Sequence, residues 1–183
     1  MKVSATEIPE VLVIEPIVHN DRRGFFSEFF RADKYSQYGI PGTFVQDNLS
    51  RSSFGVVRGL HLQNPTAQGK LVGVLRGAAL DVAVDVRLGS PTFGKHVAVE
   101  LNEQNRKQLW VPRGFAHGFA VLSDVVDFFY KCDALYCAKD EIVIRWNDPA
   151  IAIDWRIQSP ELSPRDAAAP LLAGVSRLPI YGS

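Results

Sequence analysis

Residues 56–87 read VVRGLHLQNPTAQGKLVGVLRGAALDVAVDVR and contain three short runs that are rich in valine and leucine. The runs at 56–62, 70–76 and 78–87 are separated by glycine, proline and asparagine, which favour turns. Apolar runs of this length between turn residues are typical of β-strands. The stretch therefore predicts three successive strands joined by short connections.

The same pattern continues on both sides of this stretch. The further candidate strands are 11–18, 25–30, 43–48, 95–101, 107–111, 117–122 and 125–131. Many short strands at this spacing predict an all-β sandwich or barrel. Residues 78–87 and 95–101 alternate between apolar and polar, which predicts one wet face, whereas 125–131 (VVDFFYK) is apolar enough for burial on both sides.

Two segments carry helix signals. A short helix is expected at 32–38, because Gly39 and Pro41 follow it. From about residue 157 the chain is rich in proline, and there Ser163 suits an N-cap and Pro164 the first helical position. We expect a second short helix there, in a segment that packs back on the barrel of a single domain covering residues 1–183.

Composition narrows the classes of partner. Lysine plus arginine and aspartate plus glutamate number 20 each, which argues against a nucleic-acid-coating surface. No apolar run approaches the roughly 18 residues that span a bilayer, and no continuous apolar signal segment opens the chain. The two cysteines, Cys132 and Cys137, are expected to be free thiols. We expect a cytoplasmic protein that binds neither nucleic acid nor membrane.

Three residues of the opening stretch could act together in proton chemistry. Arg58 and His61 lie on one predicted strand, and Lys70 begins the next. An imidazole can remove a proton beside a carbonyl, and an ammonium can stabilise the oxyanion that forms. Strict alternation places Arg58 and His61 on opposite faces, so both enter one site only if Gly59 permits a bulge or twist. An exposed hairpin with scattered polar residues is the alternative.

A second motif lies in VPRGFAHGFAV, where Pro112, Gly114 and His117 form a PxGxxH pattern. Alone, His117 fits a structural histidine at a strand start. The pattern, however, resembles the second half of the cupin signature, whose first half supplies an HxH pair in metal cupins. Here His61 is followed two residues later by Gln63, so a metal would have too few ligands. The resemblance predicts a cupin fold that uses no metal and no other cofactor.

Eight motifs occur in order along the chain: DRRGFFSEFF, FVQDNLSRS, VRGLHLQ, QGKLV, DVAVDVRLGSPTFG, LWVPRGFAHGF, WNDPAIAIDW and LSPRDAAAP. Over roughly residues 6–172 the chain resembles the dTDP-4-dehydrorhamnose 3,5-epimerase family. The resemblance implies a jelly-roll β-barrel with a few short helices, mainly near the C-terminus. It also implies a homodimer that epimerises carbons 3 and 5 of dTDP-4-dehydro-6-deoxy-D-glucose.

The resemblance assigns four catalytic residues. The ketone at carbon 4 of such a sugar acidifies the neighbouring C–H bonds, so the reaction needs a base, a proton donor on the other face and a stabilised enolate oxygen. His61 matches the base and Asp166 the carboxylate that pairs with it. Lys70 matches the cation beside the enolate oxygen, and Tyr130 matches the proton donor. By composition alone, Tyr130 would be a core aromatic and Asp166 a first-turn acid.

The binding residues implied by the resemblance are Arg23, Glu28, Gln46, Asp47, Asn48, Arg58, His117, Tyr136, Glu141 and Arg165. Tyr136 matches an aromatic that stacks on thymine, and Arg23 and Arg58 are natural diphosphate ligands. In the family the N-terminal strand reaches into the neighbouring subunit, so Arg23 and Glu28 are expected to serve the partner's site.

Departures from the family pattern leave alternatives open. Arg165 replaces a common lysine, and Leu62 stands where an aromatic is common. A close alternative is an epimerase that acts at only one of the two carbons. More remote alternatives are a metal-dependent cupin, such as a dioxygenase, and a sugar-binding barrel without catalysis.

Overall fold

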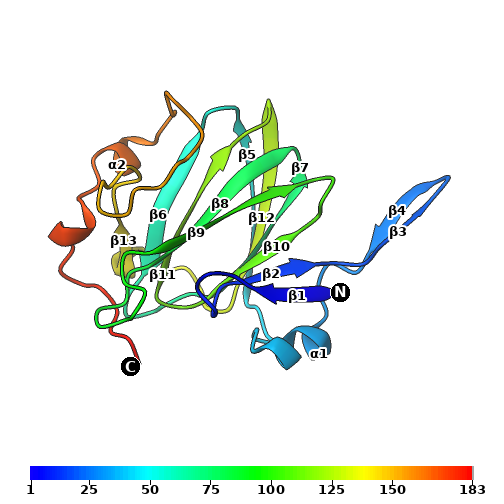
Figure 1. Cartoon of the computed structure of the whole chain (residues 1–183), viewed down its shortest axis with the longest axis horizontal. Helices are drawn as coiled ribbons and strands as arrows, with labels where there is room; N and C mark the ends of the chain where they lie inside the picture. Colours follow the sequence, from blue (N-terminus) through cyan, green and yellow to red (C-terminus); the bar gives the residue numbers. More distant parts are fainter. Residues whose placement is uncertain (183) are drawn as a thin grey trace.

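Two antiparallel sheets face each other in the computed structural model, which describes residues 1–182 (Figure 1). The six-stranded sheet has the order β1 (Lys2–Ala5), β2 (Leu12–Glu15), β10 (Gln108–Val111), β7 (Lys70–Arg76), β12 (Val125–Cys132) and β5 (Gln46–Ser53). The five-stranded sheet has the order β13 (Glu141–Val143), β6 (Val57–Gln63), β11 (Phe115–Val121), β8 (Ala78–Asp85) and β9 (His96–Asn102). The predicted all-β jelly-roll fold is confirmed, although within residues 1–182 the two sheets do not close into a barrel.

The remaining elements are short. A hairpin of β3 (Val18–Asp21) and β4 (Gly24–Ser27) projects away from the two sheets (Figure 1). The helical turns are α1 (Ala32–Tyr35), η1 (Ser36–Tyr38), η2 (Ala138–Asp140), α2 (Pro164–Ala167) and η3 (Leu172–Gly174). The helix expected at 32–38 is confirmed as α1 followed by η1. None of the helices in residues 1–182 has the length and apolar character needed to cross a membrane.

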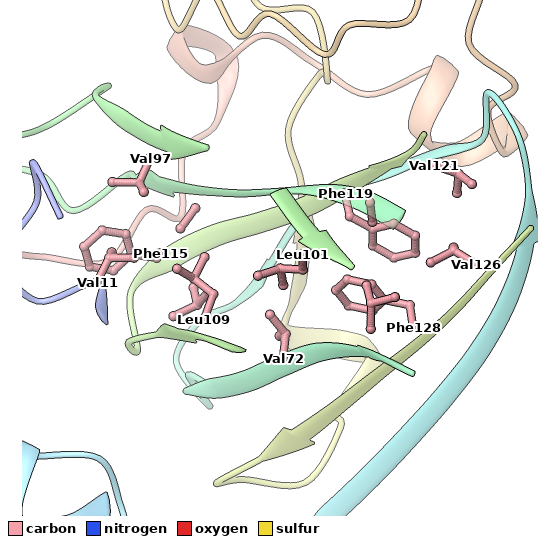
Figure 2. Packing of buried hydrophobic residues seen from close by; sticks show 14 of the residues in the cluster. Val11, Val72, Val97, Leu101, Leu109, Phe115, Phe119, Val121, Val126 and Phe128 are labelled. Atoms are coloured by element: carbon pink, nitrogen blue, oxygen red, sulfur yellow. The ribbon is translucent and has the colours of Figure 1, made fainter. Parts of the chain in front are cut away.

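The main core fills the space between the sheets (Figure 2). Phe119 of β11 and Phe128 of β12 stack with their ring centroids 4.0 Å apart, which joins the two sheets directly. Inward-facing valines and leucines of both sheets complete this layer. This core joins β7 and β12, which carry Lys70 and Tyr130, to β11, the strand that pairs with β6 and its His61.

A second core covers the outer face of the five-stranded sheet. Trp155 and Leu172 of the C-terminal segment pack with Leu80 and Val84 of β8. As a result β8 is buried on both faces, and the wet face predicted for 78–87 was wrong. The prediction that 125–131 is buried on both sides was also wrong, because the covering segment lies on the other sheet and β12 is only partly buried on its outer side.

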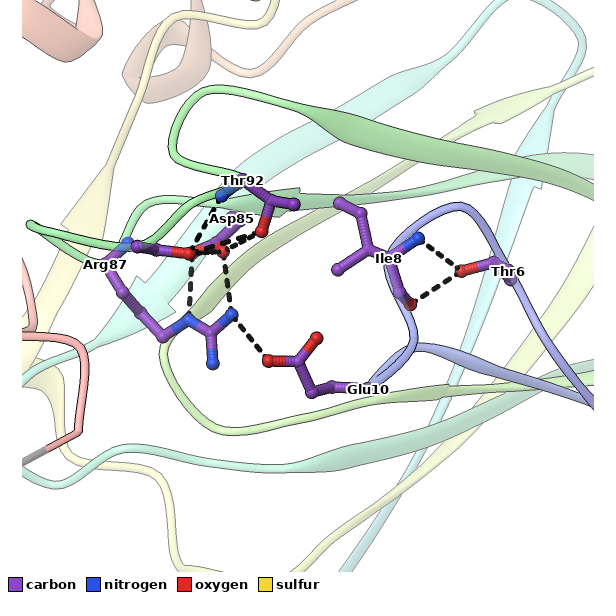
Figure 3. Close-up of polar contacts among 7 residues, drawn as sticks. Thr6, Ile8, Glu10, Asp85, Arg87 and Thr92 are labelled. Carbon is purple, nitrogen blue, oxygen red and sulfur yellow. Dashed lines mark hydrogen bonds and ion pairs between the residues drawn. The ribbon is translucent and has the colours of Figure 1, made fainter.

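A polar cluster holds the end of β8 (Figure 3). The buried carboxylate of Asp85 accepts hydrogen bonds from Arg87, Ser90 and Thr92, and Arg87 also bonds Glu10. Burial alone favours the neutral acid, but the hydrogen bonds from these three residues prevail and lower the pKa of Asp85 to about 2. The cluster joins the N-terminal segment to the five-stranded sheet.

Replacing Asp85 with asparagine is expected to lower the free energy of unfolding at pH 7 by about 3 kcal/mol, because Arg87 loses its buried partner. The pKa of Asp85 in the folded state lies below the ordinary value of 3.8. The ionised carboxylate therefore stabilises the fold fully at pH values above 3.8, and this stabilisation is lost as the pH falls toward about 2. Urea unfolding measured at several pH values from 7 to 3 should therefore show that the difference in unfolding free energy between wild type and Asp85→Asn becomes smaller in acid. Asp124→Asn, at an exposed position, is the control; an equal loss there would contradict the assignment.

Candidate active site

The backbone around Gly59 is irregular, as the placement of Arg58 and His61 in one site requires. On the neighbouring strand, His117 lies opposite His61, but the register then shifts so that Phe119 lies opposite Arg58. Gly59 has a φ of +133°, and a Cβ there would lie 2.6 Å from the Cα of Gly118. Only glycine fits this close approach of two strands. The shift allows Arg58 and His61 to line the same cavity.

Two cavities lie between the sheets, and His61, Lys70 and Tyr130 line both of them. The Phe128 cavity, of about 160 Å³, is also lined by Ser50, Arg58, His117, Gly118, Phe119 and Phe128. The Tyr136 cavity, of about 80 Å³, is also lined by Gln46, Asn48, Leu62, Gln63, Gln68, Cys132, Tyr136 and Glu141. His61 belongs to the five-stranded sheet, whereas Lys70 and Tyr130 belong to the six-stranded sheet. These side chains therefore approach the cavities from opposite walls.

His61 is held by a buried carboxylate. Its Nε2 lies 2.7 Å from Oδ1 of Asp166, whose side chain is only 4% exposed. The N-cap of α2 positions Asp166, because Ser163 Oγ accepts a hydrogen bond from the Asp166 N–H at 3.1 Å, as predicted for this residue. Burial raises the pKa of Asp166, but the interactions with His61, Gly59 and Ser163 together outweigh it, and the net pKa is lowered. An ionised Asp166 only accepts, so the Nε2 of His61 donates, and in the neutral imidazole Nδ1 is the nitrogen that carries the lone pair.

Burial shifts the pKa of both groups on the opposite wall. The pKa of the Lys70 ammonium is lowered by burial, although the negative groups around it, Glu141 and Asp81 among them, oppose the shift. The pKa of the Tyr130 phenol is raised by burial, so this hydroxyl is protonated at neutral pH. A phenol that keeps its proton can act as a donor toward the cavity.

His117 and Arg58 are fixed at the Phe128 cavity by polar neighbours. The Nε2 of His117 lies 2.7 Å from Oδ1 of the buried Asp81. The guanidinium of Arg58 donates two hydrogen bonds to Ser52 Oγ, at 3.1 and 3.0 Å. These contacts hold both side chains at the wall of the Phe128 cavity, where His117 is buried and Arg58 is also exposed to solvent.

A chain of polar contacts borders the Tyr136 cavity. The phenol of Tyr136 donates to Glu141, and Arg165 NH1 donates to the same carboxylate at 2.7 Å. Gln46 and Asn48 share one face of β5, and their side chains bond each other at 3.0 Å. The structure thus brings these five predicted binding residues to one side of His61.

Apart from Arg165, which reaches the border of the Tyr136 cavity through its bond to Glu141, three predicted binding residues line neither cavity. Asp47 points to the other face of β5, where it bonds Lys131 at 2.8 Å. Arg23 lies on the projecting hairpin and pairs with Asp21 at 2.6 Å, and Glu28 follows the hairpin. Within one chain, these side chains are therefore separate from His61.

Sequence reasoning missed several residues that line the cavities, namely Ser50, Gln63, Gln68 and Cys132. Gln63 and Gln68 lie only two residues from His61 and Lys70 respectively, so proximity in the sequence could have indicated them. Both cysteines are free thiols, as predicted. Across residues 1–182, no three His, Cys, Asp or Glu side chains are grouped as a metal site requires.

A histidine paired with a buried carboxylate, facing a phenol and an ammonium across one cavity, defines the class: a jelly-roll enzyme built for proton transfer. The family model described as dTDP-4-dehydrorhamnose 3,5-epimerase matches residues 5–174 of this chain. The chain belongs to the dTDP-4-dehydrorhamnose 3,5-epimerase family.

Relatives resemble the chain over nearly its whole length. A dTDP-4-dehydrorhamnose 3,5-epimerase from Shigella flexneri is 52% identical over 168 residues, which cover 91% of this chain and 93% of the relative. One from Neisseria gonorrhoeae is also 52% identical, over 169 residues that cover 92% of this chain, but the chain spans only 52% of that longer relative.

A solved structure shows the same fold. The crystal structure of dTDP-6-deoxy-D-glucose-3,5-epimerase from Legionella pneumophila in complex with dTDP-4-keto-L-rhamnose superimposes with a TM-score of 0.97 at 51% identity. The match covers 100% of this chain and 99% of that one.

Proposed function

We propose that the protein epimerises carbons 3 and 5 of dTDP-4-dehydro-6-deoxy-D-glucose to form dTDP-4-dehydro-L-rhamnose, in dTDP-L-rhamnose biosynthesis. Membership of the family supports the substrate class. The observation that carries the proposal is the placement of the His61–Asp166 pair on one wall of a cavity and Tyr130 on the other. Inversion at carbon requires a base and an acid on opposite faces of the sugar.

The proposed chemistry runs through an enolate. Nδ1 of His61 removes the proton from a carbon next to the ketone. The C–H electron pair forms a double bond to carbon 4, and the electron pair of the C=O double bond moves to the oxygen, which becomes negative. The Lys70 ammonium stabilises that oxygen. The Tyr130 hydroxyl then gives its proton to the opposite face of the same carbon. Asp166 stabilises the imidazolium formed at His61. The imidazolium then gives a proton to water and the Tyr130 phenolate takes one from water, so His61 and Tyr130 return to their starting states.

The residues around the Tyr136 cavity are proposed to hold the nucleotide. Tyr136 stacks on the thymine, Gln46 and Asn48 lie beside it, and Glu141 is bonded to Tyr136 and Arg165. Arg58 and His117 face the Phe128 cavity, where they are placed to bind the diphosphate or sugar oxygens.

Turnover in D₂O tests the proposed function. The purified protein is given dTDP-4-dehydro-6-deoxy-D-glucose in D₂O, and deuterium at each sugar carbon is followed by NMR. We expect label at both carbon 3 and carbon 5. Label at one carbon only would identify a single-position epimerase, and label at neither carbon would refute the proposed function.

A homodimer that exchanges its N-terminal hairpins is part of this proposal. The hairpin of β3 and β4 projects from the body (Figure 1). On it, the side chains of Phe25 and Phe26 are 55% and 68% exposed. Large exposed aromatic side chains of this kind are typical of interaction surfaces. Exchange of the hairpin would bring Arg23 and Glu28, which lie away from their own cavity, to the cavity of the partner.

Mixed dimers test the exchange. Arg23→Ala and His61→Ala chains, each nearly inactive alone, are co-expressed with different tags. If the hairpin serves the partner, one site in each mixed dimer has both wild-type residues, and random pairing should restore about a quarter of the wild-type activity. Activity no higher than that of the two parent variants would show that each hairpin serves its own chain.

The cytoplasm is the proposed location, because two free thiols suit a reducing compartment.

A further inference from the structure

The loop that carries Tyr136 is held by glutamine side chains. This loop, residues 133–137, follows β12 and is called the Tyr136 loop below. Within residues 1–182, the backbone groups of residues 134–136 make hydrogen bonds only to side chains, and each of those side chains is a glutamine. The position of Tyr136 therefore depends on amides contributed by other parts of the chain.

Gln63, at the end of β6, makes two hydrogen bonds to the backbone of the Tyr136 loop, at Leu135 and Cys137. Its Oε1 accepts from the N–H of Cys137 at 2.8 Å, and its Nε2 donates to the carbonyl of Leu135 at 3.4 Å. The same Nε2 donates to the carbonyl of Thr66 at 2.7 Å. Gln63 is only 5% exposed. Its two N–H groups and its oxygen are thus occupied, so it lines the cavity without an N–H left to offer a ligand.

Two further glutamines hold the same loop from different directions. Gln68, which precedes β7, donates to the carbonyl of Ala134 at 2.8 Å. Gln46, on β5, accepts from the N–H of Tyr136 at 2.8 Å. The loop is therefore attached to β6, to the β6–β7 connection and to β5. The first two attachments come from residues 57–70, the stretch that also carries His61 and Lys70 on strands of different sheets.

We propose that Gln63 and Gln68 are positioning residues that fix Tyr136 for recognition of the nucleotide base. They act through the Tyr136 loop and not by contact with the substrate. The inference rests on the proposed function, in which Tyr136 stacks on the thymine. It also gives a role to position 63, where the resemblance to metal cupins predicts a histidine ligand and this chain has an amide instead.

The physical reason is the cost of ordering a loop. Stacking on an aromatic ring is productive only if the ring is already held at the right place, because otherwise binding must also order the loop. Within the part of the loop at residues 134–136, no backbone ladder fixes the chain, because the backbone bonds of the loop are confined to its ends at Asp133 and Cys137. The glutamine amides supply that order before the nucleotide binds.

Binding of dTDP, measured by calorimetry, is the main test, together with kcat and KM. Gln68→Met removes one partly exposed contact with the loop, and Gln63→Met removes the buried contacts. In each variant we expect the Kd for dTDP and the KM to rise about tenfold, which is the effect of losing one stacking contact. Because the proton-transfer groups are untouched, kcat should change less than twofold. Asn64→Ala is the matched control, since this neighbouring amide bonds Arg177 instead of the loop.

A double-variant cycle separates positioning from general destabilisation. Tyr136→Leu should weaken dTDP binding by itself, and adding Gln68→Met to it should then cost almost nothing, because Gln68 acts through Tyr136. Independent losses in the double variant, or a fall in kcat with an unchanged Kd, would overturn the inference. If the wild type neither binds dTDP nor labels its substrate, the proposed function fails instead, and the two failures are distinguished. Should Gln63→Met not fold, Gln68→Met alone carries the test.

Discussion

Replacing His61 with alanine is expected to lower turnover about a thousandfold and to abolish deuterium incorporation at both sugar carbons, because general-base catalysis is worth this much in enzymes. His61 is the cavity histidine that is paired with Asp166, at 2.7 Å, and that faces Tyr130 and Lys70 from the opposite sheet. One base serving both carbons predicts that exchange at carbon 3 and at carbon 5 is lost together.

The His61→Ala measurement needs proof that the variant is folded and binds ligand. Its Kd for dTDP should stay within a few-fold of wild type, since stacking on Tyr136 does not involve the imidazole. His96→Ala is the control, because His96 lies on β9 and lines none of the cavities around His61. Exchange that survives at either carbon in His61→Ala would mean that another group is the base.

Replacing Tyr130 with phenylalanine is expected to separate exchange from inversion. The base is untouched, so a proton should still leave the substrate and return as deuterium on the same face. The phenol whose raised pKa keeps it protonated is gone, so delivery to the opposite face should fall about a hundredfold. The substrate pool should therefore gain deuterium while little epimerised product appears.

One NMR time course in D₂O gives both rates for Tyr130→Phe. Label in the recovered substrate reports exchange, and the ring-proton couplings of the product report inversion. Tyr38→Phe, which removes the hydroxyl of a tyrosine 45% exposed on η1, should match the wild type in both rates. Equal loss of exchange and inversion in Tyr130→Phe would contradict this division of roles.

Much of the fold follows from local pattern. Apolar runs between turn residues are a local property, so most strands could be predicted, and Ser163 with Pro164 marked the start of α2 for the same reason. The burial of individual strands could not be predicted, because it depends on which distant segment covers them. Both faces of β8 are buried only because Trp155 and Leu172 of the C-terminal segment pack on its outer face.

The candidate site divides in the same way. The resemblance indicated His61, Lys70, Tyr130 and Asp166 from short motifs. It could not show that residues 134–136 of the Tyr136 loop have glutamine partners in place of backbone partners, since those contacts join residues up to 90 positions apart.

By itself, the sequence determined most of the secondary structure and the chemical groups available. The alternation of apolar and polar residues, the turn residues and the side-chain types are all properties of short stretches of the chain. Only the tertiary structure decided which groups meet. The register shift beside Gly59 turns Arg58 and His61 toward one cavity, and the fold-back of the C-terminal segment brings Asp166 within 2.7 Å of a ring that lies 105 residues away. Such contacts depend on the packing of two sheets and a covering segment, which no stretch of the chain specifies alone.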